Sequence, residues 1–105
     1  MEESNNPLRI EDSAFVDVAD LDVFFFEIDP ELAYRLEEEL AEALDRIRRY
    51  PERGSFYEDE IRCFRLASLP CYVFYEAEQT ETVIYAIAHE HESPERILRR
   101  LEEYL

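Results

Sequence analysis

Histidines and glutamates alternate near the end of the chain, at positions 89 to 92. Side chains two positions apart on a strand project to the same face, so His89 and His91 could share one metal ion. Borderline metals usually take three or four protein ligands, and the sequence supplies no obvious third ligand beside this pair. We therefore interpret His89 as a structural histidine at a strand end, and we expect neither a metal nor a cofactor.

All 11 basic side chains are arginines, and several gather in the middle of the chain. These are Arg46, Arg48, Arg49, Arg53, Arg62 and Arg65. Guanidinium groups bind phosphates and carboxylates in well-defined geometries. The simpler interpretation is that they pair with nearby glutamates, and the alternative is that they bind an anionic partner. No phosphate-binding glycine loop, serine triad or zinc-ribbon spacing accompanies them.

Two cysteines flank an expected turn at Ala67-Ser68. A two-residue turn would place Cys63 and Cys71 on opposite faces of the hairpin, and a three-residue turn would place them face to face. Buried free thiols are the usual state in a cytoplasmic protein. No sequence feature activates either thiol for a nucleophilic pair with His89.

The residues above belong to apolar runs of strand length at 60–66, 69–76 and 81–89, separated by short turn signals. This pattern is typical of an antiparallel meander. Alternation predicts that Val83, Tyr85 and Ile87 share one face of the last strand. The opposite faces are also apolar, so we expect the helices to cover one face of the sheet. A partner or the C-terminal helix should cover the other.

The segment 13–28 carries conflicting patterns, because some of its apolar residues follow a helical stripe and others alternate as in a strand. That length is long for a strand, and Asp12 or Ser13 can cap a helix, so we predict a helix. Three consecutive phenylalanines are expected to divide between the core and an exposed interface edge: Phe24, Phe25 and Phe26.

A second helix is predicted between Asp29, as its N-cap, and Pro51, which stops it. The short connection makes the two helices an antiparallel hairpin. The segment 52–59 is expected to be a loop. Ser93 and Pro94 begin a last helix, whose apolar side consists of Ile97, Leu98, Leu101 and Leu105.

Together these segments predict one α+β domain over residues 1–105, of which 1–6 should be a disordered tail. It has a short N-terminal strand from Leu8, an antiparallel helical hairpin packed on a three- to four-stranded, mainly antiparallel sheet, and a C-terminal helix. A chain of 105 residues with 47% hydrophobic residues can bury a core without disulfides. It contains neither a signal peptide nor a membrane-spanning run, so we expect a cytoplasmic protein that does not bind membranes.

The charge is strongly acidic, with 27 acids against 11 bases and a net charge of −16. Such a surface repels phosphate backbones, so direct nucleic-acid binding is not expected. The acidity fits either a saline cytoplasm or a partner with a basic face.

The order of these segments resembles the RelE/ParE superfamily of toxins from type II toxin–antitoxin modules. The stretch from Leu32-Ala33 to Pro51-Glu-Arg-Gly54 is similar to the family's second helix and its closing Pro-x-x-Gly. Arg62, Arg65-Leu66 and Leu69-Pro-Cys-Tyr-Val-Phe-Tyr75 resemble its arginine strand and its Phe-Pro-Tyr-x-Ile-x-Tyr strand. Ile87-Ala-His89 and Pro94 resemble its final strand and His-x-x-Arg-x-Pro ending. The resemblance covers residues 8–98 and is closer to the ParE branch.

The chain departs from the family in its acidity and at Glu92, where the motif has an arginine. RelE-like members cut messenger RNA with a cluster of basic residues, whereas ParE-like members bind DNA gyrase without catalysis. Because RNA cleavage needs cations around the reacting phosphate, the resemblance favours a non-enzymatic, ParE-like toxin with a gyrase-type protein target. The alternatives are a degenerate member that only binds, and a ribonuclease that uses Arg46, Arg49, Arg62, Arg65 and His89.

The resemblance also implies a cognate antitoxin that lays an amphipathic segment across the hairpin and the sheet. The expected partner-binding residues are Phe24, Phe25, Phe26, Tyr72, Phe74 and Glu92. A homodimer is the alternative cover for the second sheet face. We expect Glu92 to be exposed near a strand end, so that Glu92→Arg leaves the fold intact.

Overall fold

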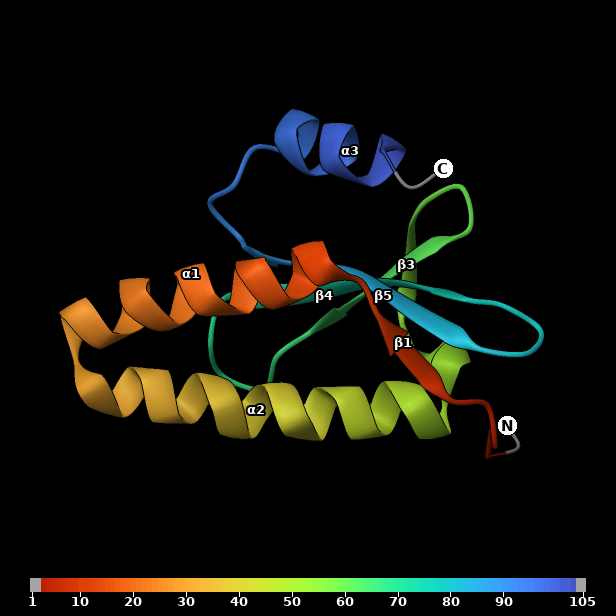
Figure 1. Ribbon diagram of the computed structural model, residues 1–105, viewed down its shortest axis with the longest axis horizontal. Coiled ribbons are helices and arrows are strands. Elements are labelled where there is room, and N and C mark those ends of the chain that lie inside the picture. The colour runs from red at the N-terminus through yellow and green to blue at the C-terminus, as the bar shows by residue number, and fades with distance from the viewer. Residues whose placement is uncertain (1–2, 104–105) are drawn as a thin grey trace.

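A mixed β-sheet forms the centre of the computed structural model, which describes residues 3–103 (Figure 1). Within those residues the strands are β1 (Leu8–Ile10), β2 (Ser55–Glu58), β3 (Ile61–Arg65), β4 (Cys71–Ala77) and β5 (Thr82–His89). Their order across the sheet is β1-β5-β4-β3-β2. β1 runs parallel to β5, and the other neighbours are antiparallel. The predicted α+β fold and its meander are confirmed.

The segment with conflicting patterns is helical throughout, as α1 (Asp12–Ile28), and α2 (Pro30–Arg49) returns antiparallel beside it. Asp29 caps α2, because its Oδ1 accepts a hydrogen bond from Glu31 N at 3.0 Å. Both helix predictions are therefore confirmed. The closed end of this hairpin projects past the sheet in Figure 1.

Helices cover both faces of the sheet. The hairpin-side core joins α1 and α2 to the sheet through Ala14, Leu21, Phe25, Leu36, Leu40, Ala43, Ile47, Cys71, Val73, Tyr75, Ile84 and Ile87, among others. The α3-side core lies beneath α3 (Pro94–Glu102) and includes Ile61, Phe74, Val83, Tyr85, Ala86, Ala88, Ile97 and Leu101. Ser93 Oγ caps α3 by accepting from Arg96 N at 3.2 Å. The C-terminal helix is thus what covers the second face, while Leu105 lies outside the described residues.

A β-bulge between β4 and β5 overturns the predicted alternation. Phe74 pairs with Ala86 but Tyr75 pairs with Ile84, so Tyr85 is an extra residue on β5. As a result Val83 and Tyr85 face α3, whereas Ile87 faces the hairpin. The prediction that these three side chains share one face is wrong, because periodicity in the sequence contains no signal for the extra residue.

The predicted loop at 52–59 is wrong over its second half, where β2 forms an edge strand paired with β3. Asp59 lies in the turn between β2 and β3 with a φ of 47°. Aspartate tolerates this left-handed conformation better than most residues. A strand this short at an edge depends on its partner more than on its own sequence. At the N-terminus, Met1 and Glu2 lie outside the described residues, and Ser4 N donates to Arg49 O at 2.7 Å.

Candidate functional site

An apolar groove of about 590 Å³ runs between α1 and α2 at the closed end of the hairpin. We call it the hairpin groove, and it is lined by Asp22, Val23, Phe26, Glu27, Pro30, Ala33, Tyr34 and Glu37. Val23, Phe26 and Tyr34 are 59%, 58% and 65% exposed. Large side chains exposed side by side are the usual mark of an interaction surface. This groove is therefore the first candidate for a protein partner.

The groove exists because α1 is apolar on two faces. Leu21 and Phe25 are buried against the sheet and α2. Successive residues of a helix are rotated by ~100°. Val23 therefore lies about 200° round the helix axis from the buried Leu21, and Phe26 about 100° from the buried Phe25. A surface helix normally carries one apolar stripe, so the second one indicates a further contact.

The three phenylalanines divide as predicted between core and exposed edge. Phe25 is 3% exposed and belongs to the hairpin-side core, whereas Phe24 is 48% exposed. The ring of Phe24 packs edge-on against His89, with centroids 5.5 Å apart. Phe26 lines the hairpin groove. Their roles toward a partner stay predictions, and Phe25 presents almost no surface to one.

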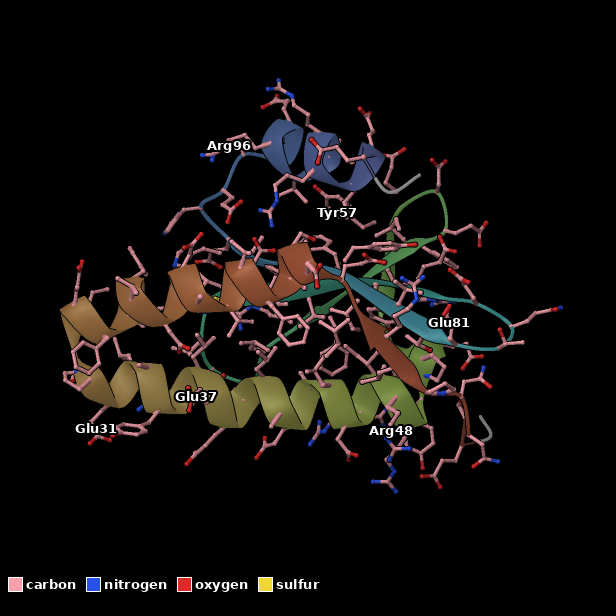
Figure 2. The ribbon with its side chains drawn as sticks, in the orientation of Figure 1. Glu31, Glu37, Arg48, Tyr57, Glu81 and Arg96 are labelled. Atoms are coloured by element: carbon pink, nitrogen blue, oxygen red, sulfur yellow. The ribbon has the colours of Figure 1, made fainter. Side chains whose placement is uncertain are left out.

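The second sheet face is closed in this structure, which bears on Tyr72 and Phe74. Phe74 is 2% exposed in the α3-side core, and its ring lies 4.9 Å from that of Tyr57. Figure 2 shows Tyr57 between the sheet and α3. A hollow of about 310 Å³ remains there, lined by Tyr72, Phe74 and Ile97 among others. A partner can reach this face only at its margin while α3 is in place.

Glu92 is partly buried and ion-paired, whereas the sequence predicted an exposed side chain near a strand end. Its carboxylate accepts a hydrogen bond from Arg100 of α3 at 3.0 Å, and its side chain is 26% exposed. Arg100 also binds Asp17 of α1, whose Oδ2 accepts from Ile87 N at 2.9 Å. Burial raises the pKa of Asp17 in spite of these contacts. Glu92→Arg would set two guanidinium groups beside each other, so we now expect it to loosen α3.

The arginines of the ribonuclease alternative have different partners. Arg62 donates to Gly54 O at 2.7 Å and stacks on Phe56, with its guanidinium carbon 3.9 Å from the ring centroid. Arg49 pairs with Glu3 and Asp45. Arg46 and Arg65 line a small groove of about 100 Å³ together with Glu39 and Glu42. Acids or backbone carbonyls thus contact most of these guanidinium groups.

The histidines and cysteines are engaged in packing. The rings of His89 and His91 stack with centroids 4.8 Å apart. Within residues 3–103, no group of three or more histidine, cysteine or acidic side chains is arranged to hold a metal. Cys63 faces α3 and Cys71 faces the hairpin, on opposite faces of the sheet. Burial raises the pKa of Cys71 to about 12, which is the reverse of what a nucleophilic thiol requires.

Residues 8–94 match the family model of the ParE toxin of the type II toxin–antitoxin system parDE. The chain belongs to this ParE toxin family. No curated protein matches the sequence. A chain of the solved structure described as the chromosomal ParDE toxin–antitoxin system from P. aeruginosa matches with a TM-score of 0.71. The two are 16% identical over 80% of this chain and 95% of that one, so this second likeness supports the ParE fold alone.

The ParE family match ends where α3 begins. Position 94 is both the last matched residue and the first residue of α3. The ion pairs of Arg100 with Asp17 and Glu92 therefore attach a helix that lies beyond the family match. None of the described helices is long and apolar enough to span a membrane.

Two contacts that shape this ParE domain were not predicted from the sequence. The hydroxyl of Tyr75 donates to Pro51 O at 2.7 Å and accepts from Gly54 N at 2.8 Å. The carboxylate of Glu39 accepts from Ser68 N and Leu69 N at 2.8 and 3.0 Å. The spacing of Pro51 and Gly54 was a signal for the first contact. The contact of Glu39 had none, since its partners lie about thirty positions away.

Proposed function

We propose that this ParE family member is a toxin that acts by binding a protein target of the DNA gyrase type, and that a cognate antitoxin neutralises it. The hairpin groove is the observation that carries the proposal, because it offers an apolar surface for a protein segment and lies within the family match. A non-catalytic mode agrees with Arg49, Arg62 and Arg65, whose guanidinium groups contact acids or backbone carbonyls. A cytoplasmic location is part of the same prediction.

The antitoxin is expected to seat an amphipathic helix on the hairpin, in the helix-in-groove mode of peptide recognition. Phe24 and Phe26 remain available for it. Tyr72 and Phe74 become available only if the antitoxin also reaches the margin of the α3-side core. Glu92 would then act through Arg100 rather than by direct contact.

Induced expression in a bacterium tests the proposal most directly. We expect growth arrest with a DNA damage response and inhibition of purified gyrase by the purified chain. If a small reading frame lies next to this gene, co-expression of its product should restore growth. The absence of arrest would leave a family member that only binds. Arrest of translation with cleaved messages would instead identify the ribonuclease alternative.

A further inference from the structure

The hairpin groove combines an apolar floor with an acidic rim. Val23, Phe26 and Tyr34 are its large apolar lining residues, and Asp22, Glu27 and Glu37 are its acidic ones. No base is among its described lining residues. α1 contains no basic residue over its whole length. In Figure 2, Glu37 and Glu31 both lie on the half of α2 that is nearer the closed end.

Asp22 is the unusual member of this rim. Its Oδ1 is buried and has no hydrogen-bond partner among the described residues. Burial raises the pKa of Asp22, and the negative charge of Glu37 raises it further. A carboxylate oxygen that is shielded from water and faces a like charge is costly in the free protein. A donor from a partner would satisfy this oxygen, and a positively charged donor would also offset the charge of Glu37.

We infer that the hairpin groove binds an amphipathic segment of the antitoxin that places an arginine or lysine between Asp22 and Glu37, with apolar side chains on Val23, Phe26 and Tyr34. This inference rests on the proposed function, since the antitoxin is its occupant. A guanidinium or ammonium group would satisfy the orphaned oxygen and remove the repulsion between the two acids. It would also give specificity, because a segment with an acid at that position would be rejected.

Charge argues against a second copy of the chain as the occupant. A symmetric dimer through this groove would bring each acidic rim against itself, and each copy carries a net charge of −16. The interface would contain apolar side chains enclosed by unpaired carboxylates, which is unfavourable. A basic segment has the opposite property, because the same field draws it toward the groove.

The test measures the affinity of the purified chain for the protein encoded next to its gene, by calorimetry at low and moderate salt. We expect Asp22→Asn and Glu37→Gln each to weaken binding by roughly ten-fold, as loss of a desolvated charge pair does. Glu38→Gln is the matched control, since Glu38 is exposed on the next position of α2 and lies off the groove. It should change affinity by less than about two-fold, as for charges outside an interface.

A second measurement separates recognition from misfolding. Because Asp22→Asn removes a repelled, poorly hydrated charge, it should raise the melting temperature of the free chain while it weakens the complex. A lower melting temperature would contradict the argument about the orphaned oxygen. If the antitoxin still binds both acid variants but not Phe26→Ala, the groove is its binding site. The inferred basic residue between Asp22 and Glu37 would then be wrong.

Two further outcomes overturn the inference. Binding that is unchanged in Phe26→Ala and in both acid variants would place the antitoxin elsewhere on the chain. A dimer in solution that dissociates on Phe26→Glu would assign the groove to a second copy. Failure of the neighbouring protein to bind at all would overturn the proposed function together with the inference, so the two failures are distinguishable.

Discussion

The hydroxyl of Tyr75 connects the end of the helical hairpin to the sheet. It bonds to Pro51 O and Gly54 N in a fully buried position. A Cβ at position 54 would lie 2.8 Å from Cε1 and Cζ of Tyr75 and closer still to its hydroxyl. The glycine is therefore required by the close approach of this ring, since its φ of −67° is open to any residue.

At the residue scale, this contact predicts that substitutions of Tyr75 and Gly54 have non-additive effects on the free energy of unfolding. Tyr75→Phe should lower the free energy of unfolding by about 1–3 kcal/mol, because it leaves a buried N–H and C=O unpaired. Gly54→Ala should also destabilise, but less so in the Tyr75→Phe background, where the nearest atom is missing. Denaturant titrations of the single and double variants would measure the coupling.

Tyr57→Phe is the control for this pair, because the hydroxyl of Tyr57 has no hydrogen bond within the described part of the chain. It should be close to neutral. If the losses in free energy of unfolding for Gly54→Ala and Tyr75→Phe are strictly additive, the ring and the glycine do not constrain each other.

The lowered pKa of Glu39 predicts that the stability of the fold depends on pH. Burial raises its pKa, but the hydrogen bonds from Leu69, from Ser68 and a nearby Arg35 outweigh burial, so its pKa lies below the usual 4.5. A carboxyl with a lowered folded-state pKa stabilises the fold above its unfolded pKa and loses that effect as the pH falls through the folded value. Glu39→Gln should therefore flatten the loss of stability below about pH 4.5.

Thermal melts of the wild type and Glu39→Gln between pH 3 and 7 would test this. Glu39→Ala should cost about 1–3 kcal/mol at neutral pH, since it removes a charged acceptor from the turn between β3 and β4. Glu38→Ala, on the exposed neighbour, is the control. Equal pH profiles for all variants would mean that Glu39 does not hold the turn.

At the scale of the element, α3 depends on Arg100 as well as on its two buried apolar residues, Ile97 and Leu101. Arg100→Ala should leave the carboxylates of Asp17 and Glu92 without their cation, which destabilises the docked helix. We expect hydrogen exchange of the α3 amides to become several-fold faster, while the central strands are unchanged.

Arg99→Ala is the matched control, because Arg99 is exposed on the adjacent position and makes no ion pair among the described residues. Glu92→Arg should resemble Arg100→Ala. If exchange in α3 stays the same in both Arg100→Ala and Glu92→Arg, apolar burial alone holds the helix on the sheet.

At the scale of the whole molecule, the charge of −16 predicts a salt dependence. Self-repulsion destabilises a compact acidic protein, and added salt screens it as the Debye length falls from ~30 Å at 0.01 M to ~3 Å at 1 M. The melting temperature should rise by a few degrees as sodium chloride is added from low concentration. Sucrose at matched osmolality is the control, and a flat or falling curve would contradict the prediction.

Local signals in the sequence determined the elements other than β2, and their order. Asp29 and Pro30 set the start of α2, Ser93 and Pro94 set the start of α3, and apolar periodicity placed the hairpin and the meander. These signals suffice because capping and periodicity depend on residues a few positions apart. The resemblance to the ParE branch followed from that order, and the family match agrees with it.

Tertiary structure decided what depends on residues far apart in the chain. The ion pair of Arg100 with Asp17 joins residues 83 positions apart. The extra residue at Tyr85 and the edge strand β2 depend on pairing with a neighbouring strand, which apolar periodicity does not encode. The hairpin groove belongs to this second group. The sequence predicted that Phe26 lies at an exposed edge. Only the packing of α1 against α2 brings Phe26, Tyr34 and Asp22 to one groove, because the two helices meet across a turn.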